Sequence, residues 1–445
     1  MKFIKSLTGF AALFLLNTFA AGAFPNYDES KVGTYTLPDP LTTLESKPVQ
    51  TKRYWMRVRR PEILNLYRED IYGKSPKPNK MIVNVWDVDT NALDGTAIRK
   101  QINLELTSKL STNRVVLHAL LYTPAASKRA PVFLCLSFSG NYRDADDTNV
   151  AVWLVWDHKK DTAAMPQPVE RGTSHNWPVR EIIKRGYGIA LLDYNDIEPD
   201  LADGTGWRFG VRALYMKPGQ TNFANDAWGA ISAWAWGASR VLDYLQTDRN
   251  VDPRRIIMTG HSRLGKTALW AGAQDQRFPI VIASCSGEMG ASLSRRDYGE
   301  TVTSMSKSFP YQFCRNFLAY SNNIPNMPVD SHMLVSLIAP RPLYLNTGSL
   351  DRWGDPRGEW QAAVAAAPVY QLFGEQSVVT NLPPAKELLE SAILETFPPP
   401  PLDVPVFHDV GYQTHTGAHD VLPADWERFL DFCDMHLYGK APHSY

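Results

Sequence analysis

Cysteine is scarce in this 445-residue chain, which contains only four. Cys135, Cys285, Cys314 and Cys433 lie far apart and show none of the spacings of metal-binding motifs. Cys135 and Cys285 fall in apolar, strand-like runs, so we expect buried thiols rather than a disulfide framework. The sequence therefore predicts no metal site, and it gives no sign of a cofactor.

The chain also lacks an excess of charge of either sign, since 46 Lys and Arg residues balance 46 Asp and Glu residues. Such a balance argues against nucleic acid and against an anionic membrane as partners. There is no internal repeat, heptad pattern or long linker, and a hydrophobic content of 44% suffices for a large core. We therefore expect a single domain over residues 24–445, present as a monomer.

Long apolar runs are missing except near the amino terminus. Residues 1–23 combine a basic start at Met1–Lys5, an apolar run around 11–16 and an Ala-x-Ala site at Ala21–Ala23. This pattern is typical of a secretory signal peptide. A membrane anchor is disfavoured because the apolar run is short and Pro25 follows closely. We expect the segment to be removed and the protein to be secreted or periplasmic.

What the chain does contain is an alternation of apolar runs and helical stretches. Strand candidates lie at 81–85, 102–106, 115–122, 132–136, 188–193, 256–258, 280–283, 343–345 and 404–407. Early strands follow one another directly, whereas later ones alternate with helical stretches such as 177–184 and 228–245. This order predicts an α/β-hydrolase fold, a three-layer αβα sandwich with a mostly parallel central sheet. Polar interruptions near 144–173 and 383–405 are interpreted as loop insertions.

One serine stands at a strand-to-helix turn. Ser262 follows the apolar run 255–259 and precedes the helical stretch 267–274, within Gly260-His-Ser-Arg-Leu-Gly-Lys266. This layout is that of a nucleophile elbow, which lifts a serine hydroxyl out of the sheet. The start of the helix then points free N–H groups, including that of Arg263, at a developing oxyanion. The alternative is that Ser262 caps an ordinary turn.

A nucleophilic serine in this fold needs an acid and then a histidine further along the chain. His419 lies on a glycine-containing loop between the last strand candidate and the terminal helical stretch, where the base belongs, and His415 is its rival. Asp351 follows the preceding strand candidate, where this fold usually places the acid. Asp355 precedes proline, as in a turn, and Glu288 is a second candidate acid.

Several motifs resemble those of one known family. They are Gly260-His-Ser-Arg-Leu-Gly-Lys266, Ser286-Gly287, Ser294-Arg-Arg296, Gly299-Glu300, Phe309-Pro-Tyr-Gln-Phe-Cys-Arg-Asn-Phe317, Ala339-Pro-Arg-Pro342, Ser349-Leu-Asp-Arg-Trp-Gly-Asp-Pro356, Gly417-Ala-His-Asp420 and Asp425-Trp426. Together they resemble the glucuronoyl esterases of carbohydrate esterase family 15, from about Ile82 to Leu437. The serine motif of that family also explains why Leu264 stands where Gly-x-Ser-x-Gly has its last glycine.

The resemblance implies roles for individual residues. Ser262 matches the nucleophile, His419 the base, and Arg263 the arginine that stabilises the oxyanion.

Three more residues match the sugar site. Lys266 corresponds to the lysine that contacts uronate hydroxyls, while Glu300 and Trp353 correspond to the acidic and indole groups lining that site. The structural alternatives are that Lys266 is a solvated helix lysine, that Glu300 pairs with Arg295 or Arg296, and that Trp353 belongs to the core.

Two departures from the family pattern matter. Fungal members have a cysteine before the serine, bridged to one beside the histidine, whereas His261 and Asp420 stand at these positions here. The commoner arrangement has a glutamate where this chain has Cys285, and some bacterial members carry the acid after the next strand instead. The second departure favours Asp351 over Glu288 as the acid.

The resemblance implies hydrolysis of the ester between 4-O-methyl-glucuronic acid of xylan and an alcohol of lignin. The expected partner is therefore a glucuronoxylan–lignin ester or a related uronate ester. Two other interpretations stay open: an acetyl xylan or other carbohydrate esterase, and a weakly active carbohydrate-binding relative. A serine peptidase is disfavoured, because no propeller-like or cap domain is evident in the sequence.

Overall fold

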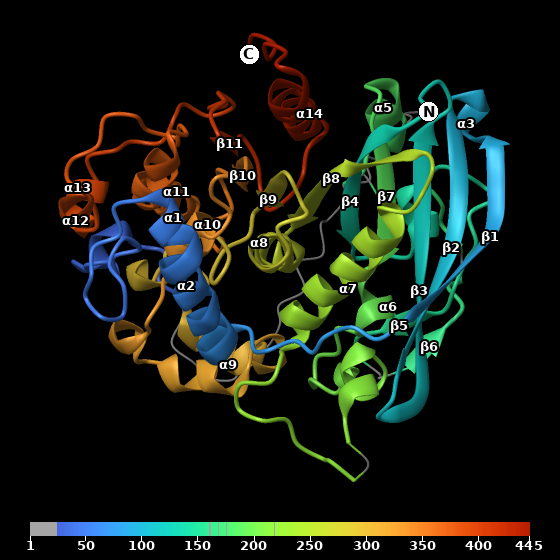
Figure 1. The fold of residues 1–445 in the computed structure, drawn as a ribbon, viewed down its shortest axis with the longest axis horizontal. Coiled ribbons are helices and arrows are strands. Elements are labelled where there is room, and N and C mark those ends of the chain that lie inside the picture. The colour runs from blue at the N-terminus through green and yellow to red at the C-terminus, as the bar shows by residue number, and fades with distance from the viewer. Residues whose placement is uncertain (1–24, 160–161, 168, 175, 218) are drawn as a thin grey trace, which may run out of the picture.

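The computed structural model describes residues 25–159, 162–167, 169–174, 176–217 and 219–445, so the expected signal peptide lies outside the described residues. The main strands are β1 (Met81–Asn91), β2 (Ala97–Ser108), β3 (Ser111–Pro124), β4 (Ala130–Ser137), β7 (Gly188–Asp193), β8 (Val251–His261), β9 (Val281–Ser284), β10 (Leu343–Gly348) and β11 (Val410–His415). Within the described chain they form one sheet in the order β1-β2-β3-β7-β4-β8-β9-β10-β11 (Figure 1).

The sheet changes from antiparallel to parallel at β7. Strands β1, β2, β3 and β7 pair antiparallel, whereas every pair from β7 to β11 is parallel. Antiparallel neighbours can be joined by short turns. Parallel strands need a crossover, because the chain must return to the end of the sheet at which each strand starts. The sequence-based expectation of a mixed sheet that becomes parallel is confirmed.

Helices cover both faces of this sheet. They are α1 (Lys52–Tyr54), α2 (Arg60–Leu66), α3 (Ala92–Gly95), α4 (Asn141–Asp144), α5 (Val179–Lys184), α6 (Tyr194–Ile197), α7 (Ala230–Leu245), α8 (Arg263–Gln274), α9 (Val302–Ser308), α10 (Ser331–Ser336), α11 (Pro356–Phe373), α12 (Ala385–Leu388), α13 (Ser391–Leu394) and α14 (Pro423–Tyr438). In Figure 1, α7 and α8 lie in front of the central strands, and the antiparallel strands β1 to β3 form the right-hand edge.

Alternation along β4 shows the three layers directly. Val132 and Leu134 belong to one buried cluster together with Trp234 of α7. Phe133, between them, belongs to a second buried cluster with Trp426 of α14. Successive strand side chains point to opposite faces, so a strand covered by helices on both sides is apolar throughout. The α/β-hydrolase architecture, an αβα sandwich, is thereby confirmed.

One strand prediction was wrong. The segment 404–407 forms only an isolated bridge, between Val406 and Tyr412, and the last strand is β11. Pro405 has no N–H to donate, which weakens 404–407 as a strand. The sequence of β11 is too polar to be recognised as an apolar run. Inside the sheet, its Gln413 is accommodated because Nε2 donates to Asn346 Oδ1 at 2.8 Å. His419 still lies between the last strand and the last helix.

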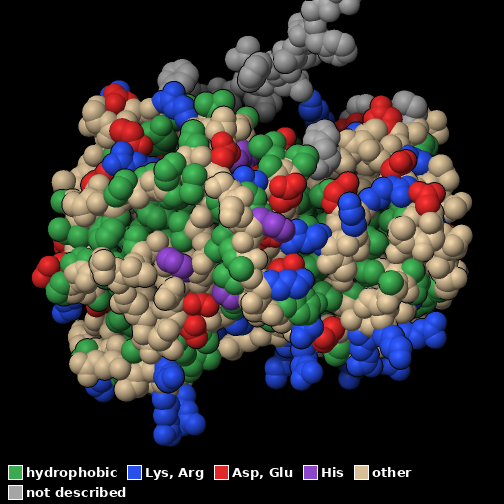
Figure 2. Space-filling model, turned by 90° about the horizontal axis from the view of Figure 1, so that it is seen from above, with side chains coloured by type: hydrophobic (Ala, Val, Ile, Leu, Met, Phe, Trp, Pro, Cys, Tyr) green, Lys and Arg blue, Asp and Glu red, His purple; other side chains and the backbone are tan. Residues whose placement is uncertain are grey.

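Both polar interruptions carry short elements. The first contains a small hairpin of β5 (Val155–Asp157) and β6 (Thr162–Ala164), and the second contains α12 and α13. All four cysteines are free and buried, as expected. Figure 2 shows acidic and basic side chains interspersed across the face seen from above. In the part of the chain that the structure describes, no helix is long and apolar enough to cross a membrane.

Candidate active site

Ser262 occupies a strained turn between β8 and α8. Its φ of 58° and ψ of −130° lie outside the regions that most side chains adopt. The turn is tight enough that a Cβ on Gly260 would lie 2.1 Å from the Leu264 carbonyl oxygen. Ser262 N–H donates to the Ser284 carbonyl at 2.8 Å, which anchors the turn to β9. Strain held in place by neighbouring structure is typical of a nucleophile elbow.

The Ser262 hydroxyl is not used as a helix cap. Ser262 is the N-cap residue of α8, but its side chain makes no capping hydrogen bond. The capping alternative raised by the sequence is therefore not what the geometry shows. The hydroxyl stands at the positive end of α8, beside the N–H of Arg263.

An acid and a histidine meet at the same edge of the sheet. Asp351 follows β10, and His419 lies on the loop after β11. His419 Nδ1 lies 2.6 Å from Asp351 Oδ2. Because a carboxylate only accepts hydrogen bonds, Nδ1 carries the proton and Nε2 is left free to act as a base. The contact predicted between these two side chains is present.

Asp351 is held in its charged form. Burial by itself raises the pKa of this carboxyl, but the hydrogen bond from His419 and that from Gly354 N–H together bring the pKa below its usual value. A carboxylate that stays ionised fixes the histidine tautomer and stabilises the imidazolium that forms during proton transfer.

The rival side chains have other partners. His415 is buried, with Nδ1 3.0 Å from Asp425 Oδ2 and Nε2 3.1 Å from the Ala418 carbonyl. Glu288 is buried and accepts a hydrogen bond from the Ser294 hydroxyl. These contacts are structural ones.

Asp355 caps a helix. It precedes Pro356 and accepts from Gly358 N–H at 3.0 Å at the start of α11. Arg296 pairs with its second oxygen at 2.8 Å. The turn role considered for Asp355 matches this geometry.

Two residues beside His419 mark the departures from the family pattern. The His261 ring lies 4.7 Å from the His419 ring, measured between centroids. Burial, together with the nearby His419, lowers the pKa of His261 to about 3, so this imidazole is neutral at ordinary pH. Cys285 is also buried there, and its thiol lies 3.7 Å from the Asp420 carbonyl. Neither residue can replace a carboxylate next to the base.

The same side chains offer ligand atoms that are close together. Those of Cys285, Asp351 and His419 all lie within 4.8 Å of one another. Burial, together with the negative charge of Asp351, raises the pKa of the Cys285 thiol well above its usual value. Since metal ions bind the thiolate, this group suits a hydrogen-bonded pair better than a metal.

Arg263 is clamped beside the elbow. Its guanidinium forms a hydrogen bond and ion pair with Asp200. The same carboxylate accepts from the Tyr194 hydroxyl at 2.8 Å and from the Tyr311 hydroxyl. The guanidinium also lies over the Phe309 ring, 5.4 Å from its centroid. These contacts fix a positive charge near Ser262, which suits stabilisation of a developing oxyanion.

The predicted sugar-site residues form one cluster. Lys266 Nζ lies 2.7 Å from Glu300 Oε2, and both side chains are buried. Trp353 Nε1 donates to Glu300 Oε1 at 3.1 Å. Lys266 is therefore not a solvated helix lysine, and Glu300 is paired with neither Arg295 nor Arg296.

Sequence reasoning missed two acids of this region. Asp200 lies just after α6, and Glu359 is on α11, where it accepts from Gly287 N–H at 2.7 Å. Burial raises the pKa of Glu359 to about 8. Neither has a local motif, because their positions depend on contacts with segments far away in the sequence. The insertion at 144–173 adjoins this network, since His158 Nδ1 lies 2.7 Å from the Asp200 carbonyl.

The fold and this serine-centred site define an α/β-hydrolase. A family model described as "Glucuronyl esterase, fungi" matches residues 220–374. The carbohydrate esterase MZ0003, from an unknown prokaryotic organism, is 37% identical over 423 residues, which are 94% of this chain and 93% of that protein.

Two solved structures are also similar. A glucuronoyl esterase from Solibacter usitatus is 42% identical, with a TM-score of 0.83, covering 91% of this chain and 99% of that one. A promiscuous CE15 esterase from a marine bacterial metagenome is 36% identical, with a TM-score of 0.82, covering 93% and 100%. The chain belongs to the glucuronoyl esterases of carbohydrate esterase family 15, which confirms the resemblance inferred from its motifs.

Proposed function

We propose that this protein is a serine esterase that hydrolyses esters of 4-O-methyl-glucuronic acid, as in the links between xylan and lignin alcohols. Relatives carry the name 4-O-methyl-glucuronoyl methylesterase, among them a protein from Hypocrea jecorina that is 34% identical over 197 residues. The observation that carries the proposal is the Lys266–Glu300–Trp353 cluster, whose Lys266 lies one helical turn past Ser262 and whose polar groups suit sugar hydroxyls.

The proposed reaction begins with proton transfer from Ser262 Oγ to His419 Nε2 as the oxygen attacks the ester carbonyl. Asp351 accepts the Nδ1–H bond and stabilises the imidazolium. The backbone N–H and the guanidinium of Arg263 stabilise the oxyanion. His419 then returns its proton to the departing alcohol, which leaves a glucuronoyl ester on Ser262. Water attacks this acyl-enzyme, again with His419 as base, and releases the uronic acid.

The cluster suits a sugar substrate because it offers hydrogen-bonding groups for hydroxyls. Lys266 supplies a cation held by Glu300, and the indole N–H of Trp353 shares the same carboxylate. Sugar hydroxyls both donate and accept hydrogen bonds, so they can bridge between such groups. A small acetyl ester presents no hydroxyls to this cluster, and its binding would not need these residues.

The test uses benzyl glucuronate and a small acetyl ester in parallel. Ser262→Ala should abolish hydrolysis of both. Lys266→Gln should raise KM for benzyl glucuronate by about tenfold, as expected for a lost charge-assisted hydrogen bond, while leaving the acetyl ester nearly unchanged. Equal losses on both substrates would assign Lys266 to the fold or to the reaction itself. Wild-type activity on the acetyl ester alone would favour an acetyl xylan esterase.

Export and assembly belong to the same proposal. The amino-terminal pattern supports secretion to the periplasm or beyond, and the lack of repeats and long linkers supports a single-domain enzyme over residues 24–445, which we expect to be a monomer. Sequencing the amino terminus of exported protein should give Phe24 first, and light scattering should give the mass of one chain. A retained Met1 or a dimer mass would contradict this part.

A further inference from the structure

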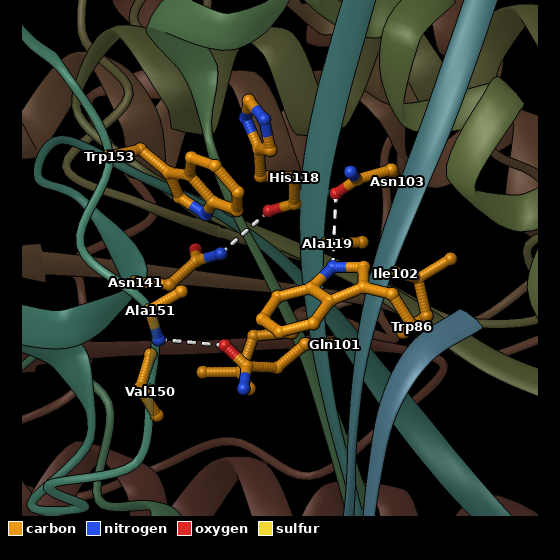
Figure 3. A pocket seen from close by; sticks show the side chains of 11 residues that line it. Trp86, Gln101, Ile102, Asn103, His118, Ala119, Asn141, Val150, Ala151 and Trp153 are labelled. Carbon is orange, nitrogen blue, oxygen red and sulfur yellow. Dashed lines mark hydrogen bonds between the residues drawn. The ribbon is translucent and has the colours of Figure 1, made fainter. Parts of the chain in front are cut away.

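The hollow between strands β1 to β3 and the segment after β4 is filled by its own side chains (Figure 3). The Trp86 indole donates to Asn103 Oδ1 at 3.1 Å across it. The Trp153 ring stacks on the His118 ring, with 4.1 Å between the centroids. No volume is left for a ligand there. A buried group without an assigned role lies instead near the other end of the sheet, on α11, which is on the left in Figure 1.

This group is the carboxyl of Glu359, which is fully buried. Its Oε1 accepts from Gly287 N–H at 2.7 Å and from the Ser286 hydroxyl at 3.1 Å. Its Oε2 has no hydrogen-bond partner among the described residues. Burial raises the pKa of Glu359 to about 8, so the acid is protonated at pH 7. Because Oε1 accepts both bonds, the proton belongs on Oε2.

The segment that Glu359 holds has an unusual backbone. The φ angle is positive at Cys285 (47°), Gly287 (58°) and Met289 (56°). Such conformations persist only where the surrounding structure holds them. The start of the segment is anchored to β10, because Cys285 N–H donates to the Asn346 carbonyl at 2.7 Å. Its middle is anchored to α11 by Glu359.

The sugar cluster rests on the middle of this segment. Glu288 N–H donates at 3.1 Å to Glu300 Oε2, the oxygen that Lys266 Nζ approaches to 2.7 Å. The fit is close, since a Cβ on Gly287 would lie 2.7 Å from Glu300 Oε2 and 3.5 Å from Lys266 Nζ. Trp353 Nε1 donates to the other Glu300 oxygen. A shift of residues 286–288 would therefore move the carboxylate that orders both donors.

The proposed catalytic groups have supports of their own. The Ser262 turn is tied to the Ser284 carbonyl of β9 at 2.8 Å. Asp351 is held by Gly354 N–H at 3.1 Å and by His419. None of these contacts involves Glu359 or residues 286–288. We therefore expect a shift of this segment to change sugar binding more than the chemical step.

We propose that Glu359 is a positioning residue for sugar recognition, which holds residues 286–288 so that Glu300 lies where it can order Lys266 and Trp353. The role rests on the proposed function, which assigns this cluster to sugar hydroxyls. Glu359 touches no substrate itself, because its side chain is fully buried. The role requires an acceptor oxygen at the right distance and does not require a charge.

The experiment compares Glu359→Gln with Glu359→Asp at pH 7, on benzyl glucuronate and on a small acetyl ester. Glutamine keeps the length, the acceptor oxygen and the neutral state, so KM should stay within about twofold of wild type. Aspartate is one carbon shorter and cannot make the same bond to Gly287 N–H. It should raise KM for benzyl glucuronate about fivefold, the loss of one hydrogen bond, with kcat and acetyl ester hydrolysis within about twofold. A normal KM in Glu359→Asp with a raised KM in Glu359→Gln would overturn the proposal.

Gln361→Ala is the matched control on the same helix. Gln361 is also buried, but its bonds go to Tyr35, Arg296 and Glu395. The variant should lose stability and keep the wild-type KM for benzyl glucuronate. A KM rise equal to that of Glu359→Asp would mean that any loosening of α11 disturbs the site, and it would overturn the specific role of Glu359.

A double variant tests whether Glu359 acts through the cluster. When Lys266→Gln has already removed the cation, adding Glu359→Asp should raise KM by less than about twofold. Full multiplication of the two single effects would show that Glu359 acts elsewhere, and it would overturn the proposal.

The outcomes separate this proposal from the proposed function. A KM for benzyl glucuronate that depends on Lys266 but not on Glu359 would overturn the positioning role and leave the proposed function standing. A wild type inactive on benzyl glucuronate would refute the proposed function, and a crystal structure of Glu359→Asp then tests the placement alone. Loss of the hydrogen bond from Glu288 N–H to Glu300 would support the positioning role, and a bond kept at 3.1 Å would overturn it.

Discussion

At the scale of single residues, the site is decided by which carboxylate remains charged beside His419. Asp351 is buried yet ionised, because His419 and Gly354 N–H donate to it. Glu288 lies in a fully buried position, and burial raises its pKa well above the usual value. Its carboxyl is bonded to Ser294 and not to His419, so it cannot stabilise an imidazolium there. The two acids that the sequence left in competition therefore differ in environment, not in chemistry.

This difference leads to a matched pair of variants. Asp351→Asn removes the charge and presents a donor to His419, so kcat on benzyl glucuronate should fall by about 10⁴-fold, as in another hydrolase. Glu288→Gln changes a side chain that is bonded to Ser294 and not to His419, and it keeps a similar shape, so kcat should stay within about threefold. Steady-state kinetics of both proteins, after matching their thermal midpoints, make the comparison. Equal losses, or the larger loss in Glu288→Gln, would reject Asp351 as the acid.

His261 gives a residue-scale prediction about pH. Its pKa is about 3 in the folded protein because of burial, whereas an unfolded histidine has a pKa of about 6.5. Below pH 6.5 the unfolded chain binds a proton that the folded one refuses, so stability is full above pH 6.5 and declines as pH falls. At pH 5 this linkage costs about 2 kcal/mol.

The measurement is chemical denaturation of wild type and His261→Gln at pH 8 and pH 5. The wild type should lose about 2 kcal/mol more than the variant between these two pH values. The pH 8 data serve as the control, because the imidazole is neutral in both states there. Parallel pH dependence in the two proteins would mean that His261 is protonated in the folded state or that it titrates normally.

At the scale of elements, the β8–α8 turn shows how backbone packing presents the serine that we propose as the nucleophile. Gly260 lets the chain pass the Leu264 carbonyl, and Gly265 lies under the Ser284 carbonyl, 2.8 Å from where its Cβ would be. Ser262 is then forced to a φ of 58°, with its hydroxyl beyond the strand end. The strain is tolerated because β9 and α8 hold both sides of the turn.

Gly260→Ala tests this account of the turn. The added methyl group would meet the Leu264 carbonyl at 2.1 Å, so the turn must shift. We expect a loss of about 1–3 kcal/mol in the free energy of unfolding and a strong loss of esterase activity even in the folded fraction. Gly33→Ala is the control, since nothing lies within 4 Å of its Cβ position. Normal activity in Gly260→Ala would show that the serine does not depend on this close approach.

At the scale of the whole molecule, the amino-terminal segment joins distant parts. Its helix α2 lies on the left in Figure 1, from where the chain crosses the front to reach β1 on the right. Arg60 of α2 is buried and donates to the carbonyls of Ala273 and Leu337, near the ends of α8 and α10. Arginine at these positions satisfies carbonyls that the helices leave free, and its charge suits the negative ends of their dipoles.

Arg60→Met should therefore destabilise the protein without altering the site. Two buried carbonyls lose their donor, and we expect a cost of about 3 kcal/mol. Arg57→Met, on the exposed side of the same segment, should cost less than about 0.5 kcal/mol. Urea denaturation gives the free energies, and kcat/KM per folded molecule should match wild type in both. A stable Arg60→Met protein would mean that other groups cap these helices.

The sequence by itself determined the features that depend on local backbone rules. The apolar runs predicted the strands, because a strand covered by helices on both faces must be apolar along its whole length. The elbow around Ser262 was readable because Gly260 and Ser262 stand between an apolar run and a helical stretch. The order of serine, acid and histidine along the chain placed Asp351 and His419 on the right loops. Each of these signals lies within a few residues of the feature that it predicts.

Only the tertiary structure decided which side chains meet. The strand β11 could not be recognised in the sequence, because it contains the polar Gln413. Its partner in the sheet, Asn346, lies on another strand. His415 pairs with Asp425 and His419 with Asp351, although both histidines share one stretch of sequence. Asp200 has no motif at all, and Arg263 reaches it across 63 residues. Such contacts join segments far apart in the chain, so no local pattern records them.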